Sequence, residues 1–298
     1  MTERRAQLGV VVAALLFGST FVIMRDSVKA AAPTAFLCAR FGIGAIVLLA
    51  LARRRGPMPR GIVVPSAITG SALLVGYVMQ TVGLQYTKTS TSAFITYLLV
   101  VLVPVFAAIQ HRALPPLVVV VAVAITTTGL WLLTGGIDAI GKGEVLTLGC
   151  AAAYALHILL IERFTNRVDV YWFIGLQLAM VSAGCFVPGL VQGGYAFGWT
   201  AWRGAIFTGI GASAVALTLQ ARGQAVLPPT RTALLLMLEP VSAAFIGYAV
   251  GERLGVGGVV GAALILVGVT LAEVGDARKL NEYKAEWPSN DPIHGGPT

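Results

Sequence analysis

Residues 90–110 are STSAFITYLLVVLVPVFAAIQ, a run without a single Asp, Glu, Lys or Arg. A helix of about 20 predominantly apolar residues is long enough to cross the hydrocarbon core of a membrane. The whole chain shares this character, because 57% of its 298 residues are hydrophobic and only 11% are charged. A soluble domain carries about 25% charged residues. The chain is therefore expected to fold within a lipid bilayer.

Ten apolar runs of this kind follow one another along the chain. We place them at residues 7–24, 33–52, 62–84, 90–110, 114–134, 143–161, 170–191, 203–222, 229–250 and 254–274. Most of the connections are short, so consecutive helices should be antiparallel neighbours. The first run resembles the start of a signal peptide, but no convincing small-residue cleavage site follows it, so we expect a retained helix. Residues 275–298 are polar, which predicts a disordered cytoplasmic tail.

Most of the 21 Lys and Arg residues fall in the loops on the side of both termini. They are Arg4, Arg5, Arg53, Arg54, Arg55, Arg60, Arg112, Arg163, Arg167, Arg222, Arg231, Arg278, Lys279 and Lys284. The positive-inside rule places this side in the cytoplasm. We therefore expect a multi-pass protein of the cell membrane, in bacteria the inner membrane, with both termini cytoplasmic. The same bias accounts for the net charge of +8, so we expect no nucleic-acid partner.

Matching positions recur along the chain at an offset of about 137 residues. The aligned pairs are Phe17-Gly18 with Tyr154-Ala155, Arg40 with Gln177, Pro104-Val105 with Pro240-Val241, and Gly129 with Gly268. Because each copy holds five helices, an odd number, the second copy must enter the membrane from the opposite side. Inverted repeats are a common construction of secondary transporters. The prediction is an all-α membrane fold of ten helices in two inverted five-helix repeats, residues 7–134 and 143–274.

Several short motifs keep a constant order along residues 9–274. They are Leu16-Phe17-Gly18-Ser19-Thr20-Phe21-Val22, Pro33 with Arg40, Gly83-Leu84-Gln85-Tyr86-Thr87, Pro104-Val105, Leu238-Glu239-Pro240-Val241, Gly251-Glu252, and Gly261 to Gly268. Together they resemble the drug/metabolite transporter superfamily, specifically the EamA-type permeases with two EamA domains. That resemblance implies export of amino acids and other small metabolites. The first copy departs from the second, since Val103 stands where Glu239 would align, so the halves are not functionally equivalent.

Two ionisable residues are expected deep in the membrane, where a charge is expensive and calls for an explanation. Glu239 lies in the ninth predicted helix and Arg40 in the second, at comparable depth. Glu239 is a candidate for proton coupling or for binding a substrate amine, and its alternative role is helix packing beside Pro240. Arg40 is a candidate for binding a substrate carboxylate. It could instead pair with Glu239, or extend its charged head to the interface.

The other substrate-binding candidates are polar or aromatic residues inside predicted helices. They are Thr20, Tyr77, Gln80, Phe94, Tyr97, Tyr154 and His157. Tyr77 and Gln80 share a helix face, and so do Tyr154 and His157. An intramembrane histidine can carry protons, so His157 is a second candidate for proton coupling. Each of these residues has helix packing as its alternative role.

Small residues and prolines are expected to shape the helices. Pro104 and Pro240 should kink the fourth and ninth helices symmetrically, because proline removes a backbone hydrogen bond. Gly257 and Gly261 allow close helix approach, either within the chain, which we favour, or in a dimer. Both a monomer and a homodimer remain open.

These features together predict a permease that works by alternating access on a small metabolite, with an amino acid as the first expectation. Proton coupling, uniport and exchange all stay open. The chain has no metal-ligating cluster and no phosphate-binding glycine loop, so we expect neither a cofactor nor an enzyme. A membrane-embedded enzyme would need clustered carboxylates at a membrane face, and a non-transporting scaffold would need a folded soluble domain. A nucleotide-sugar carrier would need several cavity cations, and only Arg40 is available.

Overall fold

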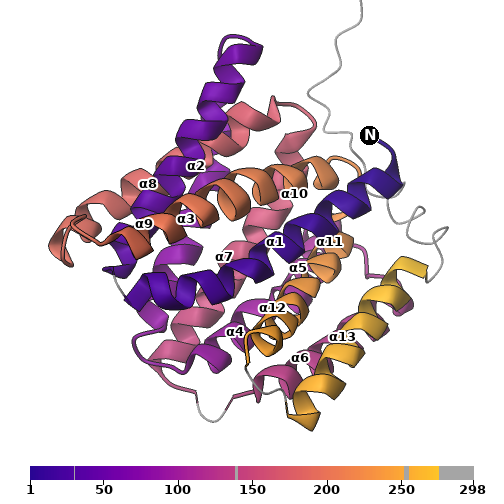
Figure 1. The fold of residues 1–298 in the computed structure, drawn as a ribbon. Helices are drawn as coiled ribbons and strands as arrows, with labels where there is room; N and C mark the ends of the chain where they lie inside the picture. Colours follow the sequence, from indigo (N-terminus) through magenta and orange to yellow (C-terminus); the bar gives the residue numbers. More distant parts are fainter. Residues whose placement is uncertain (30, 138–139, 252–254, 275–298) are drawn as a thin grey trace, which may run out of the picture.

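The computed structural model describes residues 1–29, 31–137, 140–251 and 255–274. The predicted disordered tail, residues 275–298, lies outside the described residues, and so does Glu252 of the second-copy motif. The part of the chain that is described folds into a bundle of helices and contains no strand (Figure 1).

The first half of the bundle contains α1 (Glu3–Lys29), α2 (Pro33–Arg55), α3 (Val63–Gly83), α4 (Thr89–Tyr97), α5 (Leu99–His111) and α6 (Leu117–Thr134). The second half contains α7 (Lys142–Thr165), α8 (Val170–Val191), α9 (Trp199–Phe207), the π-helix η1 (Thr208–Ala216), α10 (Leu217–Gln224), α11 (Pro229–Leu236), α12 (Leu238–Ala249) and α13 (Val256–Val274). Within the described residues, nine helical segments are long and apolar enough to cross a membrane. With 27 residues, α1 is a tenth helix of crossing length.

Local sequence explains several helix ends. Pro33 occupies the first turn of α2, where a missing N–H costs nothing. Asp169 caps α8, because its Oδ1 accepts hydrogen bonds from the backbone N–H groups of Tyr171 and Trp172, both at 3.0 Å. Gly135 ends α6 in the left-handed conformation with φ of 83°, which a glycine adopts without strain.

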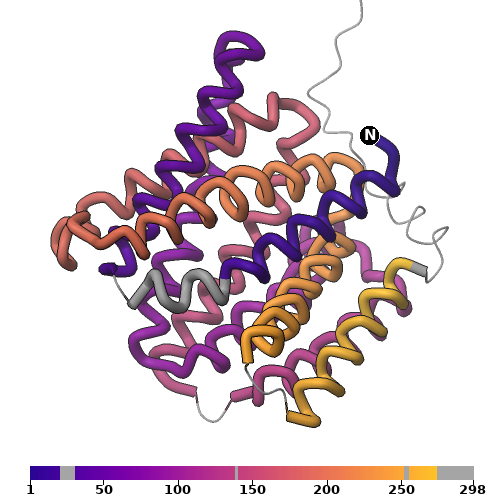
Figure 2. The backbone as a smooth tube through the Cα atoms, in the orientation of Figure 1, coloured from indigo at the N-terminus to yellow at the C-terminus, as the bar shows by residue number. Residues whose placement is uncertain are grey.

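The main contacts between the two halves are symmetric, because corresponding helices of the two halves pack against corresponding partners. The second helix of each half packs against its counterpart, α2 against α8, and the last helices do the same, α6 against α13. Figure 2 shows α6 and α13 side by side at one edge of the bundle. The first helices follow the same rule, since α1 packs against α12 and η1 while α7 packs against α4, α5 and α3. This exchange symmetry is the predicted inverted repeat.

Glycines bring α6 and α13 together at two related points. A Cβ atom on Gly129 would lie 2.6 Å from the carbonyl oxygen of Gly261, and one on Gly268 would lie 2.9 Å from that of Ala122. In both contacts the added Cβ would meet a backbone carbonyl oxygen of the facing helix. Neither glycine can therefore be replaced by a larger residue unless the helices move apart. Gly261 therefore serves packing within the chain, as the sequence analysis favours.

The fourth helix of each half is broken into two segments. The breaks lie at Leu98, between α4 and α5, and at Met237, between α11 and α12. Pro240 explains the second break, because it cannot bond to the carbonyl of Leu236. Pro104 lies farther from Leu98 and would release the carbonyl of Val100 instead. The two breaks correspond between the halves, but only the break at Met237 has a proline as its cause, and the proline of the first half lies inside α5.

Candidate functional site

Arg40 is a buried cation in the middle of α2, with only 4% of its surface exposed. Its Nε donates a hydrogen bond to Oγ of Ser213 at 3.0 Å. Its guanidinium also lies over two aromatic rings, 5.2 Å from the centroid of Phe41 and 6.0 Å from that of Tyr77. Cation–π contacts of this kind are worth most where water is excluded. These partners explain how a full positive charge can be held inside the bundle.

The π-helix η1 presents Ser213 to Arg40. A π-helix has one more residue per hydrogen-bonded turn than an α-helix and is often found at functional sites. The approach between η1 and α2 is close, because a Cβ on Gly209 would lie 2.6 Å from the carbonyl oxygen of Arg40. Gly44 on α2 is equally confined, since its Cβ would lie 2.8 Å from the carbonyl oxygen of Gly209. The two glycines therefore set the distance between Ser213 and Arg40.

A chain of aromatic and amide side chains extends from Arg40 across the bundle. The ring of Tyr77 meets Phe41 at 4.7 Å and Tyr154 at 5.5 Å, both edge to face. The hydroxyl of Tyr154 donates to Oε1 of Gln80 at 3.3 Å, and Nε2 of Gln80 donates to Oγ1 of Thr96 at 3.3 Å. Helices α2, α3, α4 and α7 thus meet at one place through polar contacts.

Glu239 lies in the first turn of α12, directly after the break at Met237. The partial positive charge of a helix N-terminus favours a carboxylate at this position. The hydroxyl of Tyr97, the last residue of α4, lies close enough to the Glu239 carboxyl group for the two to interact. Arg40 and Glu239 also interact through their charges. The two broken helices therefore place a carboxylate within the electrostatic reach of the buried arginine.

We call this group the central cluster: Arg40, Tyr77, Gln80, Tyr97, Tyr154, Glu239 and Ser213. Four of its members keep part of their surface accessible although they contact buried neighbours, namely Tyr77, Gln80, Tyr154 and Glu239. Gly76 makes room for one of the rings, since a Cβ there would lie 2.3 Å from Tyr154. The cluster combines a cation, a carboxylate and aromatic walls at one point of the bundle.

Three predicted site residues make their main contacts elsewhere. Nε2 of His157 and Oε1 of Gln177 are 2.9 Å apart, and both residues are buried. The hydroxyl of Thr20 donates to the carbonyl of Phe17 in its own helix at 2.7 Å. Phe94 belongs to the apolar core together with Tyr97. His157 and Gln177 occupy the places of Thr20 and Arg40 in the other repeat, so the two halves fill corresponding positions differently.

Sequence reasoning misses one member of the cluster, Ser213, and two residues that contact the cluster, Phe41 and Gly76. Ser213 lies in an apolar run and gives no signal until the π-helix turns it toward Arg40. Phe41 directly follows Arg40, and only the packing of α2 shows that its ring supports the charge. The contact of Gly76 with the ring of Tyr154 likewise cannot be predicted until the packing of α3 against α7 is known.

A separate groove lies between α2 and α8. Its volume is about 330 Å³, and its lining is largely apolar, with Ser182 and Cys38 as its polar groups. Oγ of Ser182 already donates to the backbone carbonyl of Cys38 at 2.8 Å. The groove therefore offers little to hold a charged molecule, in contrast with the central cluster.

Comparison with known proteins identifies relatives of both halves. The sequence profile of the EamA-like transporter family matches residues 4–135 and, a second time, residues 141–273. A curated protein of Archaeoglobus fulgidus named "Uncharacterized transporter" is 30% identical over 162 residues, which are 54% of this chain and 50% of that protein. The chain thus spans about half the length of this relative. A solved structure described as "Crystal structure of protein" shares the fold, with a TM-score of 0.80 and 20% identity over 93% of this chain and all of that one.

Proposed function

We propose, from the premise that this chain belongs to the EamA-like transporter family, that the central cluster is the substrate site of a secondary transporter. The protein is a multi-pass membrane transporter of a small molecule. We propose an amino acid or a related zwitterion as that molecule. The observation that carries this proposal is the placement of Arg40 and Glu239, a cation and a carboxylate, within one aromatic-walled group of residues.

When the substrate binds, its two charged groups replace Arg40 and Glu239 as each other's electrostatic partners. Before it binds, Arg40 and Glu239 moderate the cost of each other's charge. A zwitterion brings both missing partners at once: its carboxylate binds the Arg40 guanidinium, and its ammonium binds the Glu239 carboxylate. Two N–H groups of a guanidinium match a carboxylate in geometry. An anion or a cation alone would leave one of the two buried charges without compensation.

The aromatic residues provide the rest of the site. Tyr77 and Tyr154 expose part of their rings beside the charged pair. Aromatic rings offer apolar contact area together with a hydrogen-bonding hydroxyl. The rings are therefore suited to contact the side chain of a bound amino acid, whereas Arg40 and Glu239 bind its carboxylate and ammonium groups. We therefore expect apolar and aromatic amino acids to be preferred over small hydrophilic ones.

The cycle is alternating access, and its direction is export from the cytoplasm. Broken helices that meet at mid-membrane are typical of transporters in which two repeats rock about a fixed site. The excess of Lys and Arg on the side of both termini supports a cytoplasmic location for that side, in the bacterial inner membrane. Proton coupling through Glu239 or His157 is part of the proposal, and uniport and exchange are its alternatives. We propose no cofactor and no enzymatic activity, and a monomer or a homodimer as the assembly.

Counterflow in proteoliposomes tests the proposal. Vesicles loaded with one unlabelled amino acid from a panel are assayed for uptake of the same labelled compound, with and without a pH gradient. We expect saturable flux for an apolar amino acid, and at least a tenfold loss in Arg40→Gln, because a charged hydrogen bond contributes about 1.5–3 kcal/mol. Absence of saturable flux across the panel would overturn the proposed function. Flux that responds neither to the gradient nor to Glu239→Gln would overturn proton coupling.

A further inference from the structure

The buried ion cluster around Arg231 lies at the end of the bundle where α1 and α11 begin and α13 ends, which we call the N-terminal face. Arg231 donates from Nε and Nη2 to the two carboxylate oxygens of Glu273, at 2.7 and 2.6 Å. Its Nη1 donates to Oε1 of Glu3. Gln7 completes the group, because its Nε2 donates to Glu273 at 2.7 Å. One arginine thereby connects three helices of the bundle.

The low exposure of the Arg231 side chain distinguishes this cluster from a surface ion pair. The side chain of Arg231 is 6% exposed, that of Glu273 is 20% exposed and that of Glu3 is 44% exposed. Burial of a charge is compensated only when the partners are well placed, as in a fork of two parallel hydrogen bonds. Arg231 is one of the cations predicted in the loops, whereas in the structure it is buried as the third residue of α11.

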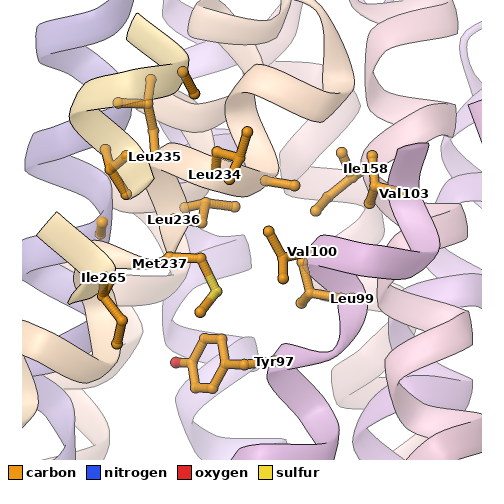
Figure 3. Packing of buried hydrophobic residues seen from close by; sticks show 14 of the residues in the cluster. Tyr97, Leu99, Val100, Val103, Ile158, Leu234, Leu235, Leu236, Met237 and Ile265 are labelled. Atoms are coloured by element: carbon orange, nitrogen blue, oxygen red, sulfur yellow. The ribbon is translucent and has the colours of Figure 1, made fainter. Parts of the chain in front are cut away.

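An apolar layer lies directly beneath the ion cluster. Leu234 and Leu235 of α11 belong to one buried core with Val100 and Val103 of α5 and Ile158 of α7. Figure 3 shows these side chains converging, with Met237 placed toward Tyr97 at the lower end. The layer therefore lies between the buried Arg231 cluster at the N-terminal face and Tyr97, which lies beside Glu239.

The corresponding helices at the opposite face are not closed in this way. The repeat relates α11 and α5 to α4 and α12. In the described chain α11 packs along α5, but no comparable packing joins α4 to α12 beyond the contact of Tyr97 with Glu239. Thr91 is the third residue of α4, as Arg231 is the third residue of α11. The structure is thus shut at the N-terminal face and looser at the other.

We propose that the Arg231–Glu273–Glu3 cluster is a latch, which holds the N-terminal face shut in this conformation and opens once in each transport cycle. This inference rests on the proposed alternating access. Arg231 and Glu239 lie on the two segments of one broken helix, so a change at the central cluster reaches the latch through the break at Met237. A ligand that pulls on α12 thereby shifts the balance between latched and open states.

Thiol labelling tests the latch without any substrate. Ala233, buried under the latch in α11, and Ala93, the matching residue of α4, are changed to Cys one at a time in the full chain. Reaction with a maleimide in detergent is then timed against the chain without an added cysteine. Glu273→Gln should speed labelling at position 233 about tenfold, the effect of weakening a charged hydrogen bond. The exchanged pair Arg231→Glu with Glu273→Arg should restore slow labelling.

A wedge at the opposite face distinguishes opening of the latch from local loosening. Ala93→Trp is added to the Glu273→Gln chain to prevent the opposite face from closing. If the faces open alternately, the wedge returns labelling at position 233 to its slow rate. Fast labelling that persists with the wedge, or no acceleration by Glu273→Gln at all, would overturn the latch. Because no substrate is present, these outcomes are independent of the flux assay that tests the proposed function.

Discussion

The two ends of the bundle are built from related sequence but are held by different chemistry. At the N-terminal face a buried arginine forks onto Glu273 and also binds Glu3. At the opposite face Glu144, the acidic residue in the first turn of α7, accepts hydrogen bonds from the hydroxyl of Thr87 and the backbone N–H of Gly141. The first helix of each half therefore has an acid in its first turn, but the two acids have different partners. A difference in charge between the faces lets one state be favoured over the other.

The largest expected effect is the loss of the arginine. Arg231→Ala leaves Glu273 and Glu3 without their cation, and breaking a buried ion pair costs about 3–5 kcal/mol. We expect the low end, about 3 kcal/mol, because both carboxylates keep some exposure. Thermal unfolding in detergent measures the loss. Thr91→Ala, at the third position of α4, is the control. An equal loss of stability in both variants would contradict the claim that, within the described residues, only the N-terminal face is held by an ion cluster.

A smaller effect is expected between the two faces, at Ser213. Ser213→Ala removes the acceptor of the Arg40 Nε hydrogen bond and should raise KM about tenfold, since a hydrogen bond to a charged group contributes about 1.5 kcal/mol. The central cluster serves both faces, so the increase should be the same whichever side the substrate is offered on. Counterflow at varied substrate concentration measures it, with Ser213→Thr as the conservative control. A fall in maximal rate with unchanged KM would contradict a positioning role.

Exchanging the charges of Arg231 and Glu273 should reduce stability less than the loss of Arg231 does. In the chain with Arg231→Glu and Glu273→Arg, one arginine still lies among two carboxylates, so stability should fall by about 1 kcal/mol or less relative to the natural chain. Unfolding temperatures of the single and double variants give the coupling between the two positions. A double variant as unstable as Arg231→Ala would show that shape, and not charge, holds this face.

The smallest effect is expected at the opposite face. Glu144→Gln removes the charge and one of the two oxygens that accept from Thr87 and Gly141. One hydrogen bond at a partly exposed helix start contributes little to stability, so we expect a small fall in unfolding temperature, below that of the exchanged pair, and no change in thiol labelling at position 233. Acceleration of labelling there by Glu144→Gln would mean that the two faces share one latch, and the contrast between them would be lost.

Hydropathy alone predicted the helices well. Each of the ten predicted runs overlaps one helix or two or three consecutive helix segments, because the energetic demand of lipid leaves few alternatives to a continuous helix. The break at Leu98 and the π-helix at Thr208–Ala216 were missed, since a change in hydrogen-bond register leaves no mark on composition. The break at Met237 was foreshadowed by Pro240.

The side chains that the structure brings together in the central cluster were selected from the sequence in part. Depth in the membrane was enough to select Arg40 and Glu239, and helix periodicity was enough to select Tyr77 with Gln80. Periodicity also grouped Tyr154 with His157, but these two side chains bond to different helices. Arg231 was missed as a buried group because a cation near the end of an apolar run is usually a loop residue. Only its partners, which are far away in the sequence, show otherwise.

The two glycine contacts between α6 and α13 have a geometric consequence. Residues 129 and 261 correspond to residues 268 and 122 in the other repeat, so each contact is the image of the other about the same axis. In the terms used for oligomers, this is an isologous interface enclosed in a single chain. Such an interface has a centre about which both partners turn by equal amounts. A rocking motion of the halves can therefore leave the pivot in place while the ends of the bundle exchange roles.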